Sequence, residues 1–121
     1  MANRHRGEIS AVLDGCERTL CLTLGALAEL EASFGADDLV ALAGRFESGK
    51  LSARDIAKII GCGLRGAGDA VRDDEVFAMR AEGAVAGFAK IAAELIRVTF
   101  GGGEEREGEN PPGASRSNGM R

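Results

Sequence analysis

The chain has 121 residues, a net charge of −4 and 45% hydrophobic residues, enough for one domain with its own core. Its acidic balance argues against broad binding to nucleic acid or to an anionic membrane, because both require clustered positive charge. The sequence has no apolar run of about 18 residues, which excludes a membrane-spanning helix. No apolar signal core follows the basic start at Arg4–Arg6, so we expect a cytoplasmic protein.

Residues 8–23 are predicted to form a β-hairpin. Asp14-Gly15 is typical of a type I′ turn, in which both central residues need a positive φ. A two-residue turn here pairs Leu13 with Cys16, Ala11 with Arg18 and Ile9 with Leu20. The alternation of apolar and polar residues agrees with that register, which places one apolar face of the hairpin toward a core.

After the hairpin, the spacing of apolar residues changes from two to about 3.6, which predicts helices. The predicted helices cover about 24–34, 39–48, 53–64, 74–79 and 84–100. Ser52 and Asp55 form a capping box for the third helix. We expect Gly35 to end the first helix, Asp37 or Asp38 to cap the second, and Asp73 or Asp74 to cap the fourth.

The last helix has a wider apolar arc than a simple surface helix needs. Its expected central stripe consists of Val85, Phe88, Ala92, Leu95, Ile96 and Thr99. Ile91 and Val98 lie on one flank of this stripe. Exposed apolar surface can mark a partner site, so we predict that Ile91, Leu95 and Val98 bind a protein partner. Ordinary core packing is the alternative role of these residues.

The expected fold is α+β: a two-stranded antiparallel hairpin packed on four or five helices in a domain of residues 1–100. Residues 101–121 combine a Gly run, a Glu-rich run and both prolines without apolar periodicity, which predicts a disordered tail. Because an isolated hairpin is marginal in water, helices or a second copy of the chain must cover its apolar face. A homo-oligomer is therefore plausible.

Gly61–Gly66 matches the G-x-G-x-x-G pattern of dinucleotide-binding loops. That function requires a strand before the glycines and a helix after them, whereas here a helix precedes them. We therefore interpret the glycines as sites of close helix packing or as a loosened helix end. No cofactor is expected.

Ser52–Val71 also resembles a helix-turn-helix, which makes a small DNA-binding regulator the alternative function. The stretch after Gly61 offers only Arg65 and Arg72 among Gly and Ala, and the chain is acidic. These features disfavour nucleic-acid binding.

Neither catalysis nor metal binding is expected. His5 is the only histidine and lies near the start of the chain, so a Cys-His or Ser-His pair on a rigid scaffold is not indicated. Cys16, Cys21 and Cys62 are odd in number and lack metal-ligand spacing, which favours reduced thiols.

The order of parts, a short hairpin that runs directly into a compact set of helices, resembles the gene transfer agent family of small tail proteins, placed among phage tail assembly chaperones. The similarity extends over about Gly7 to Phe100. It is carried by Gly7–Ile9, Asp14–Gly15, Thr19–Glu31, Phe34–Gly35, Gly49–Asp55 and Gly63–Gly68.

This resemblance implies a role in tail assembly for a bacterial phage, prophage or gene transfer agent. A protein of this kind is expected to bind the long helical tape measure protein, to keep it soluble, and to meet the tail tube protein that assembles around it. The expected chemistry is binding alone, in the cytoplasm or in association with a phage-like particle.

Overall fold

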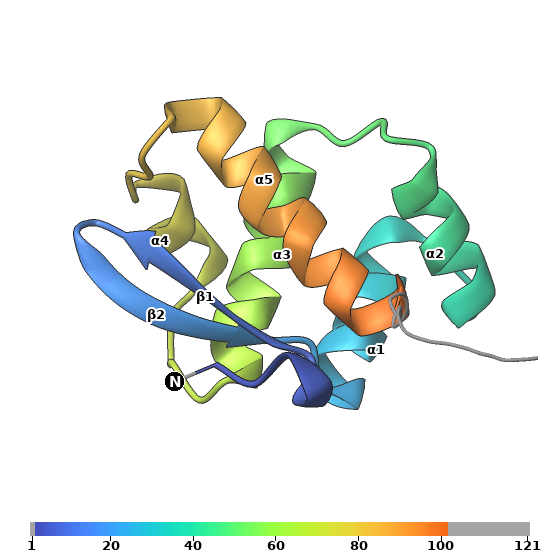
Figure 1. The fold of residues 1–121 in the computed structure, drawn as a ribbon. Helices are drawn as coiled ribbons and strands as arrows, with labels where there is room; N and C mark the ends of the chain where they lie inside the picture. The colour runs from blue at the N-terminus through green and yellow to red at the C-terminus, as the bar shows by residue number, and fades with distance from the viewer. Residues whose placement is uncertain (1, 102–121) are drawn as a thin grey trace, which may run out of the picture.

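The computed structural model describes residues 2–101 and confirms the predicted α+β fold (Figure 1). These residues contain one two-stranded antiparallel sheet and five α-helices. Their bounds are β1 Glu8–Leu13, β2 Cys16–Cys21, α1 Leu24–Phe34, α2 Leu39–Glu47, α3 Ala53–Gly66, α4 Asp73–Phe77 and α5 Ala84–Ile96. The predicted tail lies, apart from Gly101, outside the described residues.

Helix α3 occupies the centre of the fold and contacts β2, α1, α4 and α5. In Figure 1, α5 crosses in front of α3, whereas α2 and α4 lie on opposite sides of this pair. An aromatic cluster holds α2 on the body of the domain: the Phe46 ring meets Phe34 and Phe100 with centroids 5.5 and 5.9 Å apart. Helix α2 therefore forms one flank of the domain, and α4 forms the opposite flank.

The hairpin has the predicted register. Leu13 pairs with Cys16 and Ile9 with Leu20 across the sheet. Asp14 and Gly15 have φ values of 55° and 76°, as a type I′ turn requires. The turn is also tied to the rest of the fold, because the Asp14 carboxylate accepts a hydrogen bond from the backbone N–H of Arg80 at 2.9 Å.

Close packing explains the glycines of α3. A Cβ at Gly63 would lie 2.6 Å from Leu95 Cδ2 of α5, and one at Gly66 would overlap the carbonyl oxygen of Cys21 in β2. Both glycines belong to a continuous helix without a strand before it, so the pattern is not a dinucleotide loop. The alternative interpretation of 52–71 as a helix-turn-helix is also wrong, because this stretch contains α3 alone and Gly61 lies inside that helix.

Three local expectations also differ from the structure. Arg72, rather than an aspartate, occupies the N-cap of α4, and its backbone N–H donates to Glu75 at 2.8 Å. The last helix is α-helical only to Ile96, and a π-helical turn, η2 (Arg97–Gly101), continues it. Val85, predicted in the core stripe, is 76% exposed because it lies in the first turn of α5, ahead of the turns that carry the buried Ala92 and Leu95.

Candidate protein-binding groove

An apolar groove opens between the first turns of α3 and α5 and the short helix α4. It has a volume of about 220 Å³. All of its lining side chains are apolar: Ala53, Ile56, Ala57, Val76, Phe77, Val85 and Phe88. Phe77 and Val85 are more than half exposed, so solvent reaches the groove at its rim. A site of this composition suits an apolar side chain better than a charged ligand.

Local sequence signals place the α3 wall of the groove. The Ser52 hydroxyl accepts from the backbone N–H of Asp55 at 3.1 Å, and the Asp55 carboxylate accepts from the Ser52 N–H at 3.0 Å. This capping box fixes where α3 begins. Ile56 and Ala57 follow directly, and they therefore enter the groove from the first turns of the helix.

The α4 wall is attached at both of its ends. At the start, Asp73 pairs with cations of α3, as described below. Beyond the end, Asp14 of the hairpin turn exchanges hydrogen bonds with the backbone of Arg80. Val76, in the middle of α4, is 2% exposed. These attachments position a helix of five residues that would be marginal by itself.

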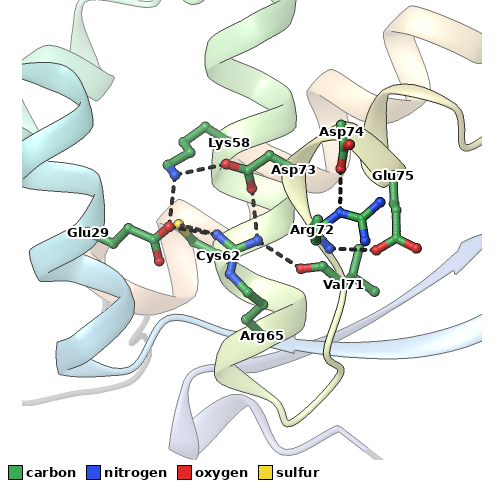
Figure 2. Close-up of polar contacts among 9 residues, drawn as sticks. All are labelled: Glu29, Lys58, Cys62, Arg65, Val71, Arg72, Asp73, Asp74 and Glu75. Carbon is green, nitrogen blue, oxygen red and sulfur yellow. Dashed lines mark hydrogen bonds and ion pairs between the residues drawn. The ribbon is translucent and has the colours of Figure 1, made fainter.

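A network of two carboxylates and two cations joins α1, α3 and α4 (Figure 2). Lys58 Nζ lies 2.8 Å from Glu29 Oε2 and 2.8 Å from Asp73 Oδ2. The Arg65 guanidinium completes the ring, at 2.8 Å from Glu29 and 2.9 Å from Asp73. Arg65 also donates to the carbonyl oxygen of Val71 at 2.9 Å. Each charge thus has two oppositely charged partners.

The network shifts the pKa values of both carboxyls downward. Burial raises the pKa of Asp73, but its hydrogen bonds with Lys58 and Arg65 and the charges of these cations outweigh burial and lower it. The hydrogen bond from Lys58 is the largest influence that lowers the pKa of Glu29, against a smaller opposing effect of burial. Gly61 makes this arrangement possible, since a Cβ there would overlap the Asp73 carboxylate.

Cys62 lies beside this network and is fully buried. Burial, followed by the charge of Glu29, raises the pKa of its thiol to about 12, which keeps it protonated and unreactive at neutral pH. Among residues 2–101, no group of three or more His, Cys, Asp or Glu side chains could hold a metal ion. The ion pairs of the network connect α1, α3 and α4.

The structure separates the three residues predicted to bind a partner from the groove. Leu95 is fully buried and belongs to the core. Ile91 and Val98 are half-buried and pack against that core. Partner binding through the exposed parts of Ile91 and Val98 stays a prediction.

The groove lies at the opposite end of α5, and the sequence analysis missed it. The sequence signal for the groove was the wide apolar arc of the last helix. Val85 and Phe88 belong to that arc and line the groove, whereas the sequence analysis predicts them in the core stripe.

Comparison with known families gives a direct result for most of the chain. Residues 6–102 match a family model described as "Phage tail tube protein, GTA-gp10". The chain belongs to this family. No curated protein and no solved structure matches the chain. The match confirms the predicted relationship to gene transfer agent and phage tail proteins, although the description names a tube protein rather than a chaperone.

The family supports a role of the protein in a phage-like tail, with other tail proteins as its partners. None of the helices in the described residues is both long and apolar enough to cross a membrane.

Proposed function

We propose that this tail protein is an assembly chaperone that binds the tape measure protein, through binding alone and without catalysis or a cofactor. The groove between α3, α4 and α5 receives apolar side chains from an amphipathic helix of that partner. The observation that carries the proposal is the apolar lining of the groove, with Phe77 and Val85 exposed at its rim.

The kind of partner follows from the walls of the groove. All three walls are helices, and none of them presents the extended edge of a β-sheet. A strand added at this place would find no free backbone edge to pair with. An amphipathic helix instead contributes side chains at i, i+3 and i+4, which match an apolar groove lined by side chains.

The groove is also formed before its partner arrives. The ion network at Asp73 and the hydrogen bonds of Asp14 hold α4 in place without any ligand. A preorganised site loses less conformational entropy on binding than one that must order itself. Capture of a helix therefore does not require α4 to fold in the same step.

Co-purification with a tape measure fragment tests the proposal. Val85→Asp places a charge at the rim of the groove, and we expect it to weaken binding at least about tenfold. Leu24→Asp is the matched control, because Leu24 is 79% exposed and also lies in the first turn of a helix, away from the groove. Equal binding by both variants and the unmodified protein would exclude the groove as the binding site.

A subunit of the tail tube is the second candidate function, and the description of the family favours it. The two functions differ in where the protein is found after assembly. A tube subunit is present in many copies in purified particles, whereas a chaperone is depleted from them and is recovered with the tape measure protein. Quantitative mass spectrometry of purified particles and of the lysate distinguishes these outcomes.

A further inference from the structure

The outer side of α5 is open to solvent beyond the groove and carries two charges of one sign. In Figure 1, no other described element lies in front of this helix. The exposed residues that follow Val85, which we call the α5 outer face, are Ala86, Ala89, Lys90, Ala93 and Arg97. Because Val85 itself lines the groove, the groove and the α5 outer face adjoin each other.

The spacing of these residues arranges them in two rows along the helix. Val85, Ala89 and Ala93 recur every four residues and form the row next to the groove. Lys90 and Arg97 are seven residues apart and form a second row, farther from the groove. Across α5 the order is therefore apolar groove, small side chains and cations. The alanines project little, so the axis of a second helix can approach that of α5 to about 8 Å.

Both cations of the α5 outer face lack an ion-pair partner among residues 2–101. Glu94 lies one turn from Lys90 and from Arg97, but its Oε2 lies 2.7 Å from Arg4 Nη1 instead. The nearby carboxylate of α5 is thus engaged by the start of the chain. Because the whole chain has 19 acidic and 15 basic residues, the α5 outer face has the opposite sign to the net charge.

We propose that the helix bound in the groove has an acidic row: it lies along α5 with its apolar side chains in the groove and against the alanines, and its carboxylates face Lys90 and Arg97. At 1.5 Å per residue, these two cations are about 10 Å apart along the axis. A matching helix therefore presents two carboxylates seven residues apart, beside its apolar row. The inference rests on the proposed function in one respect, since it takes the groove as the site that receives a helix.

Charge complementarity favours this partner over two other kinds of helix. A basic amphipathic helix would bring its own cations next to Lys90 and Arg97, and like charges repel each other. A helix that is apolar on all sides would cover both cations without pairing them, which costs free energy. Each exposed ion pair changes affinity by only about 1.5- to 5-fold. The α5 outer face therefore determines which helix binds, whereas the groove supplies most of the affinity.

Two designed helical peptides test the inference with the full chain. Both carry the same row of leucines; beside that row, one has glutamates and the other has lysines at two positions seven residues apart. Fluorescence anisotropy of a label on each peptide measures its dissociation constant. We expect the glutamate peptide to bind at least about threefold more tightly at low salt, and the difference to shrink as salt screens the ion pairs. The net charge of the protein acts in the opposite direction, because it attracts the lysine peptide.

Charge reversal on the α5 outer face gives the decisive result. Lys90→Glu and Arg97→Glu should each reduce the preference for the glutamate peptide, and the two together should invert it. Lys50→Glu is the matched control for each single variant, because Lys50 is exposed, lies between α2 and α3, and undergoes the same change of charge. It should keep the preference. If circular dichroism shows that a reversed variant is unfolded, Lys90→Gln and Arg97→Gln replace it and should remove the preference without inverting it.

The inference and the proposed function fail on different results. Equal binding of the two peptides, tighter binding of the lysine peptide, binding of neither, or an unchanged preference in the outer-face variants would overturn the inference. Unchanged binding of the glutamate peptide by Val85→Asp would do the same, since this peptide is expected to enter the groove. The proposed function fails instead if the tape measure fragment does not bind, and the two peptides still test the charge preference of α5 in that case.

Discussion

The replacement of Gly66 by alanine tests whether close packing explains the glycines of α3. Gly66 is the last residue of that helix, and a Cβ there would overlap the carbonyl oxygen of Cys21. That oxygen belongs to the backbone of β2 and cannot rotate away as a side chain can. Relief of the overlap requires α3 and the hairpin to move apart, although both contribute to one core.

The size of the effect follows from two opposing contributions. Overpacking of this kind costs about 1–3 kcal/mol. Alanine in place of glycine returns at most about 1 kcal/mol of helix propensity, and less in a terminal turn. We therefore expect Gly66→Ala to lower the free energy of unfolding by about 1–2 kcal/mol. At about 4–8 °C per kcal/mol for a domain of roughly 100 residues, Tm falls by about 5–15 °C.

Gly44→Ala is the matched control. Gly44 lies inside α2, and a Cβ there would meet nothing within 4 Å. The same substitution should therefore raise stability by about 0.5–1 kcal/mol through helix propensity alone. Thermal and denaturant unfolding, followed by circular dichroism, measures both variants without any ligand. A Gly66→Ala protein as stable as the wild type would refute close packing as the reason for this glycine.

Three further predictions concern the ion network at Asp73, the capping box at Ser52 and the flank of α5 at Ile91. The folded-state pKa of Asp73 is lowered, so the stability that Asp73 contributes is present above its unfolded pKa, near 4, and is lost as the pH falls through the folded value. Asp73→Asn should lower the free energy of unfolding by about 1 kcal/mol at neutral pH and reduce the loss of stability on acidification. Asp37→Asn, at an exposed residue outside the network, should leave stability at neutral pH unchanged. Ser52→Ala should cost about 1 kcal/mol in urea unfolding, because it removes the cap of α3. Ile91→Asp should destabilise by about 2 kcal/mol or more and Val85→Asp by much less, since only Ile91 packs against the core; equal Tm values would contradict this difference.

The sequence by itself determined the hairpin and the start of α3. The turn at Asp14-Gly15 and the alternation of the flanking residues established the register of the hairpin, since both signals act within a few residues. Ser52 with Asp55 likewise located the start of α3. The resemblance to gene transfer agent tail proteins rested on the order of such elements, and the family match confirms it.

Only the tertiary structure decided which apolar residues remain exposed and what the glycines and charges contact. A period of 3.6 marks the apolar face of α5, but coverage of that face depends on how α5 crosses α3, which leaves Val85 open and buries Leu95. Gly66 meets a carbonyl group 45 positions earlier, and Asp73 pairs with Lys58 and Arg65 only after the chain has folded back. Contacts between distant residues depend on the packing of whole elements, which no local pattern records.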